Sequence, residues 1–156
     1  IRSDKSVPTY DHAPEMQAKS IADAVIQTIT EGKHDLIICN FANADMVGHT
    51  GNLEATKKAV EAIDVNLGLM LDCLADHQGQ AIITADHGNA ESMHNPDSEQ
   101  PHTAHTSNPV PMIYVGSPAQ GQTSGKLSDI APTLLQCLKI DPPKTMSGQS
   151  LIQWDD

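Results

Sequence analysis

The chain has 156 residues and a formal net charge of −11, with 9 basic and 20 acidic side chains. Its content of 38% hydrophobic and 19% charged residues excludes a largely disordered protein. An acidic sequence without a basic run excludes nucleic acid and anionic membranes as partners, and no apolar run reaches the roughly 18 residues of a membrane span. We therefore expect a soluble, cytoplasmic chain of about one domain's length.

The first third of the chain predicts one helix and one strand. Residues 1–19 contain Pro8 and Pro14 and show no apolar periodicity, so we expect an extended N-terminal segment. Apolar residues three and four positions apart then predict a helix over residues 20–31. Residues 35–40 are apolar and rich in branched side chains, which favours a buried strand, and residues 41–52 are expected to form a polar loop.

The longest periodic stretch begins at Leu53 and predicts an amphipathic helix. Its apolar stripe consists of Val60, Ile63, Leu67, Met70, Leu71 and Leu74. The short apolar run Ala81–Thr84 predicts a second buried strand. The polar segment that follows extends to Asn108, and connections of this length are usually functional or disordered.

The last third predicts a strand, a helix and a short final element. Residues 111–115 favour a third strand, and residues 116–125, rich in Gly, Ser and Gln, are expected to be mobile. Ser128 is expected to cap a helix, and residues 146–152 to form a turn or short strand. This alternation predicts an α/β fold with a mainly parallel sheet flanked by helices. Three strands make a thin sheet, so further strands are expected to come from elsewhere.

Aspartates and histidines gather in the loops next to the expected strands. These residues are Asp45, His49, Asp86, His87, His102 and His105. Because ligands of open α/β sheets collect at the carboxyl ends of strands, we expect the separate groups to converge on one crevice. The other histidines lack a converging partner and are interpreted as surface groups: His12, His34, His77 and His94.

Imidazole and carboxylate ligands without thiolate suit divalent ions such as Zn²⁺ or Mn²⁺. A dimetal site could hold a phosphate inside an acidic protein, because two carboxylates only partly neutralise the metal charge. The alternative for each residue alone is an ordinary polar turn, since His is only an occasional metal ligand. His102 and His105 are three positions apart in an irregular loop, so this pattern leaves open which of them faces the site.

Four segments, residues 43–51, 83–91, 102–106 and 127–133, closely resemble cofactor-independent (2,3-bisphosphoglycerate-independent) phosphoglycerate mutase in that family's order and spacing. Residues 7–11 and 14–16 also match, so the resemblance spans nearly the whole chain. It implies an alkaline-phosphatase-like fold and a glycolytic isomerase that interconverts 3-phosphoglycerate and 2-phosphoglycerate through a phosphoserine. The implied cofactors are two divalent metal ions, Mn²⁺ first, with Zn²⁺, Co²⁺ or Mg²⁺ as alternatives.

The resemblance also implies roles for the candidate residues. Asp45, His49 and His105 would bind the first ion, and Asp86 and His87 would contribute to the second. The family pattern prefers His105 to His102. The ions would activate the serine and stabilise charge on the transferred phosphoryl group.

The chain departs from the family in length and in missing residues. Family members are much longer, and nothing here matches their serine nucleophile, a further aspartate ligand or the substrate-binding arginines, since Arg2 is the only arginine. Because the chain also begins with Ile1 instead of Met, we interpret residues 1–156 as the C-terminal portion of the phosphatase-like domain, with segment 1–19 leading into an α/β core at 20–156. The expected partners are phosphoglycerate and the absent N-terminal portion with its substrate domain, without which the chain is expected to be inactive. The alternatives are an inert metal-binding fragment, or part of another enzyme of the alkaline phosphatase superfamily such as phosphopentomutase.

Overall fold

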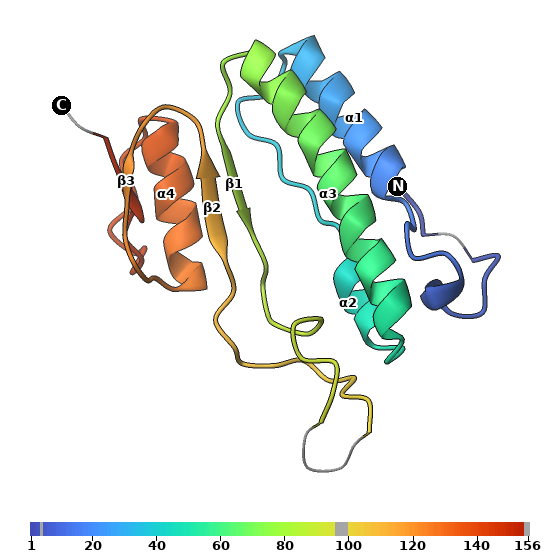
Figure 1. Ribbon diagram of the computed structural model, residues 1–156. Helices are drawn as coiled ribbons and strands as arrows, with labels where there is room; N and C mark the ends of the chain where they lie inside the picture. The colour runs from blue at the N-terminus through green and yellow to red at the C-terminus, as the bar shows by residue number, and fades with distance from the viewer. Residues whose placement is uncertain (4, 96–99, 155–156) are drawn as a thin grey trace. The chain divides into compact units, whose positions relative to one another are not determined.

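The computed structural model describes residues 1–3, 5–95 and 100–154. The chain divides into two compact units, and Figure 1 labels the helices α1–α4 and the strands β1–β3. Unit 1 comprises Ile1–His77 and His87–Val110, and unit 2 comprises Gln78–Asp86 and Pro111–Asp156. Helices and strands alternate along the chain, so the predicted α/β class is confirmed.

Two long helices, α1 (Ala18–Glu31) and α3 (Leu53–Asp76), pack side by side in unit 1 (Figure 1). Both confirm predictions made from apolar periodicity. Their buried residues are mainly small ones: Ala18, Ala22 and Val25 of α1, and Ala55, Thr56 and Ala59 of α3. Asn52 caps α3, because its side-chain oxygen accepts a hydrogen bond from the Ala55 N–H at 3.1 Å.

The expectation of a polar loop over residues 41–52 is wrong, because Asn43–Gly48 forms the short helix α2. The buried Asn43 side chain donates to the carbonyls of Pro14 and Glu15, at 2.9 and 2.8 Å. Val47 is fully buried in a core cluster with residues of α3. These tertiary contacts stabilise a six-residue helix that is too short to be stable by itself. Gly51 then adopts a left-handed φ of 73°, which reverses the chain between α2 and α3.

Unit 2 contains the paired strands and the last helix. β1 (Ala81–Thr84) pairs with β2 (Met112–Val115), and β3 (Gln120–Gly121) pairs with β4 (Ile152–Gln153). A 3₁₀ turn, η2 (Leu127–Asp129), leads into α4 (Ile130–Cys137), and another, η1 (Tyr10–His12), lies in unit 1. Buried Thr133 of α4 accepts a hydrogen bond from the Leu151 N–H at 3.0 Å and thereby ties α4 to the segment before β4.

The expected parallel pairing is not found among the described strands, because β1–β2 and β3–β4 are both antiparallel. A parallel pair needs a crossover connection that carries the chain back to the start of the sheet, usually a helix. The loop after β1 contains no helix in its described residues, and β2 returns directly along β1, with Ala81 opposite Val115.

Two further local expectations are corrected. Residues 35–40 do not form a strand, and Ile38 is 79% exposed. A strand requires a neighbour for its backbone N–H and C=O groups, and no described segment pairs with these residues. Asp129, not Ser128, holds the start of the last helical segment, because its carboxylate accepts hydrogen bonds from the N–H groups of Lys126 and Gln149.

The long loop after β1 belongs mainly to unit 1 and folds back on itself. Gly88 pairs with Thr106, and His94 pairs with Pro101, so the two arms of the loop run beside each other. This pairing returns His105 to the start of the loop. None of the helices in the described part of the chain is long and apolar enough to cross a membrane.

Candidate metal centre

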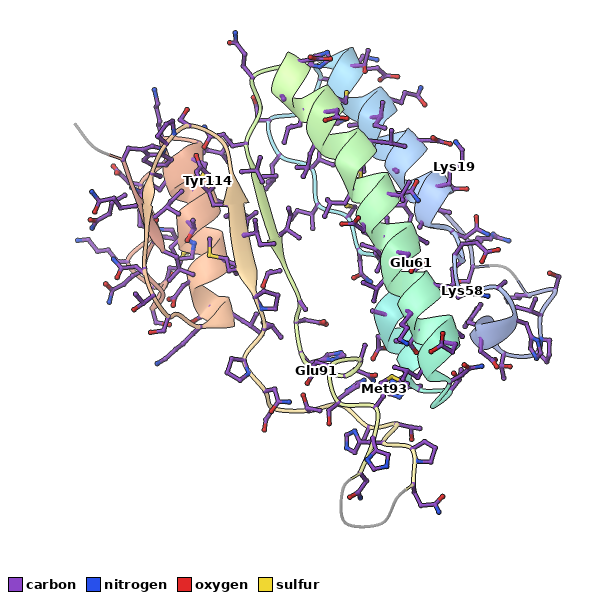
Figure 2. The ribbon with its side chains drawn as sticks, viewed as in Figure 1. Lys19, Lys58, Glu61, Glu91, Met93 and Tyr114 are labelled. Carbon is purple, nitrogen blue, oxygen red and sulfur yellow. The ribbon has the colours of Figure 1, made fainter. Side chains whose placement is uncertain are left out.

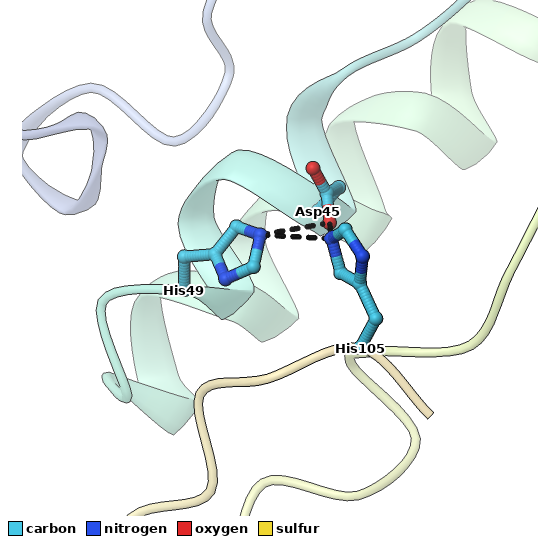
Figure 3. Close-up of side chains that lie close together, drawn as sticks. All are labelled: Asp45, His49 and His105. Carbon is cyan, nitrogen blue, oxygen red and sulfur yellow. Dashed lines mark hydrogen bonds and ion pairs between the residues drawn. The ribbon is translucent and has the colours of Figure 1, made fainter. Parts of the chain in front are cut away.

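Three of the predicted ligands converge in unit 1 and form an Asp–His cluster of Asp45, His49 and His105 (Figure 3). The Asp45 Oδ1 atom lies 3.2 Å from His49 Nε2 and 3.0 Å from His105 Nε2. The two Nε2 atoms lie 3.0 Å from each other. Both imidazoles are exposed and Asp45 is half-buried, so a small solute reaches the cluster from solvent.

Helix α2 determines the positions of the first two candidate ligands. Asp45 and His49 are four residues apart, so their side chains emerge from the same face of the helix. His49 Nδ1 lies 2.5 Å from the Thr103 carbonyl oxygen. Because a carbonyl only accepts, Nδ1 carries the hydrogen and the neutral ring presents a bare lone pair at Nε2. The backbone of the long loop thus fixes the tautomer that a metal ligand needs.

His105 comes from the returning arm of the loop and is held from two sides. The neighbouring Thr106 N–H donates to the Gly88 carbonyl at 2.8 Å, which closes the base of the loop. The His105 ring also stacks on the His87 ring, with 3.8 Å between centroids and 24° between planes. His87 therefore touches the cluster through its ring face.

Asn89 and Glu91 connect the two arms of the loop to α2. The Asn89 amide Nδ2 donates to Asp45 Oδ1 at 3.2 Å. The Glu91 carboxylate accepts from the Asn89 N–H at 2.6 Å, from the Asn108 side chain at 2.9 Å and from the Thr106 hydroxyl. These hydrogen bonds, that of Thr106 first, lower the pKa of Glu91 from 4.5 to about 2, so the carboxylate stays charged.

The donor set of the cluster fits a divalent cation. Ligand atoms bound about 2.0–2.2 Å from one ion in tetrahedral or octahedral geometry lie roughly 2.8–3.6 Å apart. The three distances in the cluster, 3.0, 3.0 and 3.2 Å, fall within this interval. Three electron-rich atoms this close need a proton or a cation between them, and two imidazoles with one carboxylate are ligands typical of Zn²⁺ or Mn²⁺.

The remaining predicted ligands lie outside this cluster. Asp86 is exposed and belongs to unit 2, directly after β1. His102 is half-buried, and its Nδ1 donates to the Ser92 carbonyl at 2.9 Å across the two arms of the loop, so it supports the loop and does not join the cluster. The other four histidines are exposed, as expected of surface groups: His12, His34, His77 and His94.

The sequence interpretation missed three groups that position the ligands of the cluster. Asn89, Glu91 and the Thr103 carbonyl position the ligands, and Asn89 and Glu91 lie inside the segment 83–91 that carried the family resemblance. A surface pocket of about 630 Å³ lies beside the cluster, and Lys5, Asp11 and His49 are among the residues that line it. This pocket therefore combines one ammonium group, one carboxylate and a metal-ligand candidate.

Comparison with known proteins gives one family and closely similar relatives. The family described as the metalloenzyme superfamily matches residues 1–142. The 2,3-bisphosphoglycerate-independent phosphoglycerate mutase 1 of Methanosarcina barkeri is 56% identical over 147 residues, which cover 94% of this chain and 28% of that protein. The 2,3-bisphosphoglycerate-independent phosphoglycerate mutase of Francisella tularensis subsp. tularensis is 50% identical over 152 residues, which cover 96% of this chain and 30% of that protein.

A solved structure agrees with these relatives. Phosphoglycerate mutase of Leishmania mexicana, crystallised at low cobalt concentration, matches with a TM-score of 0.90 and 31% sequence identity. The match covers 99% of this chain and 31% of that structure. The resemblance expected from the motifs is thus confirmed, and the chain spans less than a third of the length of the proteins it matches.

Proposed function

Because the chain belongs to the metalloenzyme superfamily, we propose that it forms the metal-binding portion of a cofactor-independent phosphoglycerate mutase. The observation that carries the proposal is the Asp–His cluster, in a chain that is 56% identical over 147 residues to a protein of that name. The proposed reaction is the interconversion of 3-phosphoglycerate and 2-phosphoglycerate in glycolysis, and a cytoplasmic location follows from this role.

Two divalent ions, Mn²⁺ in this proposal, would be the cofactors. Asp45, His49 and His105 would hold the first ion, and Asp86 and His87 would contribute to the second. When bound, such ions lower the pKa of a coordinated hydroxyl group and offset the negative charge of a phosphoryl group during its transfer. Within the chain, the Thr103 carbonyl favours the tautomer of neutral His49 that carries its hydrogen on Nδ1, which leaves the Nε2 lone pair for a metal, and the Asn89 amide orients the Asp45 carboxylate.

The pocket beside His49 supports an anionic substrate. Phosphoglycerate carries a phosphate and a carboxylate, and both groups bind ammonium side chains. Lys5 would contribute such a charge in the pocket, which Asp11 and His49 also line. The total charge of −11 would otherwise repel the substrate, so a local positive group and bound cations are needed to admit it.

The rest of the reaction would depend on the remainder of a full-length enzyme. The chain spans 28% of the Methanosarcina relative. The proposed serine nucleophile, the remaining ligands of the second ion and the arginine contacts to substrate would come from the part outside this chain, which is its proposed partner. The chain alone should therefore give no mutase turnover, and turnover by the isolated chain would contradict this division of labour.

Calorimetric titration with Mn²⁺ tests the proposed metal centre. His49→Ala removes a proposed ligand and should weaken binding by more than the about 10- to 100-fold typical of losing a ligand's hydrogen-bond partner. His77→Ala is the matched control, because His77 is also an exposed histidine but lies outside the cluster. Equal Mn²⁺ affinity in wild type and His49→Ala would reject the assignment of the first ion to the Asp–His cluster.

A further inference from the structure

We propose that Glu91 and Asn89 form a positioning clamp that holds Asp45 and His105 at the spacing a divalent cation requires. Neither residue belongs to the Asp–His cluster, so the clamp acts through other groups. The inference rests on the proposed metal centre and deepens it, because it identifies what fixes the geometry of the ligands before a metal binds.

Asn89 links the clamp to α2. The residue is 6% exposed, and Nδ2 donates to Asp45 Oδ1, the oxygen that also faces both imidazoles. Asn89 Oδ1 is buried and has no hydrogen-bond partner among the described residues. It lies against the Cα of Gly48, where a Cβ atom would collide with it. Rotating the amide by half a turn would place its oxygen against the Asp45 carboxylate, so only the observed orientation binds Asp45.

Glu91 links Asn89 to His105. One carboxylate oxygen accepts from the Asn89 backbone N–H, and the other accepts from the Thr106 hydroxyl and the Asn108 amide. Thr106 directly follows His105, and Asn89 follows His87 by two residues. One carboxylate therefore joins the arm that carries Asn89 to the arm that carries His105.

The clamp explains how an irregular loop supplies a ligand with a defined position. His105 comes from a segment without helix or named strand, and side chains on such segments vary in position unless other contacts fix them. Figure 2 shows that Glu91 and the control residue Glu61 lie on different elements, the loop and α3. The Glu91 carboxylate accepts three charge-assisted hydrogen bonds, which are stronger than bonds between neutral groups and so restrain the loop.

The test compares Glu91→Gln and Thr106→Val with Glu61→Gln. Glu91→Gln replaces a carboxylate oxygen with a donor, and Thr106→Val removes the hydroxyl that donates to it. Each substitution should weaken Mn²⁺ binding about 10- to 100-fold in calorimetry. The double variant should lose little more Mn²⁺ affinity than either single variant, because both substitutions break the same hydrogen bond. Thr106→Ser keeps the hydroxyl and should bind as wild type does. Glu61→Gln removes the same charge from an exposed site and should change affinity by less than about twofold.

Two readouts separate positioning from general stability. The visible absorption spectrum of bound Co²⁺ should change in Glu91→Gln and Asn89→Ala, because it reports ligand geometry, and stay unchanged in Glu61→Gln. In metal-free protein, amide hydrogen exchange of Thr106 should accelerate in Glu91→Gln while exchange in α3 does not. If Glu91→Gln and Asn89→Ala both bind Mn²⁺ with wild-type affinity and both give the wild-type Co²⁺ spectrum, the clamp proposal is wrong. Absence of Mn²⁺ binding by wild type, with Thr106 still protected through Glu91, would instead reject the metal centre.

Discussion

Glu91 is an exposed carboxylate whose hydrogen-bond partners hold its pKa well below the ordinary value for a glutamate. Hydrogen bonds from Thr106, Asn108 and the Asn89 backbone lower its pKa to about 2, against an ordinary value of 4.5. A pKa lowered by folding means that the charged form is stabilised in the native state. The contribution of charged Glu91 to the free energy of unfolding is complete at pH values above the ordinary pKa. It is lost as the pH falls through the lower pKa of the folded state.

Measuring the stability of Glu91→Gln over a series of pH values tests whether Glu91 stabilises the folded protein above its ordinary pKa and loses this effect in acid. The variant should have a lower free energy of unfolding than wild type at neutral pH, because the amide accepts fewer hydrogen bonds than the carboxylate. The difference should shrink as the pH falls from 4.5 toward about 2, since a protonated carboxyl group resembles the amide. Urea unfolding on both sides of pH 4.5 measures the difference, and a constant difference across the series would contradict the lowered pKa.

At the same scale, residue type and spacing identified candidate ligands, the family resemblance was needed to select the cluster among them, and neither identified the groups that hold it. Asp45 and His49 stand out as a carboxylate and an imidazole four residues apart, and His105 was chosen through the family resemblance. The Thr103 carbonyl has no sequence signature, because every residue carries one. The roles of Asn89 and Glu91 depend on contacts between the two arms of the loop, which residue spacing does not reveal.

At the scale of elements, long periodic segments were predictable and short ones were not. α1 and α3 carry enough apolar repeats to specify a helix, and β1 is a bounded apolar run. α2 has only six residues and is stabilised by burial of Asn43 and Val47, so its local sequence alone suggested a loop. Residues 35–40 have the composition of a strand, yet strand formation requires a neighbour that the described chain lacks.

Alanine substitutions at two helical glycines separate the general preference of helices for alanine from the contact between α2 and the loop. At Gly68 of α3 an added Cβ meets no heavy atom within 4 Å, so Gly68→Ala should stabilise the protein by about 0.5–1 kcal/mol. At Gly48 of α2 an added Cβ meets the buried Asn89 oxygen, so Gly48→Ala should destabilise it by about 1–3 kcal/mol. Urea unfolding measures both values, and Gly48→Ala should also weaken Mn²⁺ binding. Equal stabilisation by the two substitutions would show that Asn89 is free to move away from α2.

At the scale of the whole molecule, the division into two units predicts where a metal acts. Asp45, His49 and His105 all belong to unit 1, whereas β1, β2 and α4 belong to unit 2. A bound ligand stabilises only the part of a protein that must unfold locally before the ligand can dissociate. At a ligand concentration 100 times the dissociation constant, this stabilisation is about 2.7 kcal/mol. The effect of Mn²⁺ bound by these three ligands should therefore be confined to unit 1. The proposed second ion, to which Asp86 of unit 2 would contribute, lacks its remaining ligands in this chain and should add no stabilisation.

Hydrogen exchange with and without Mn²⁺ tests this boundary. At saturating Mn²⁺, amides of α2 and of residues 101–106 should exchange up to about 100-fold more slowly, because their opening breaks the site. Amides of β2 and α4 should exchange at the metal-free rate. His49→Ala should abolish the slowing in unit 1, which distinguishes the site from diffuse attraction of cations to a chain with a net charge of −11. Equal slowing in both units would mean that they open together, since the metal would then stabilise one cooperative structure.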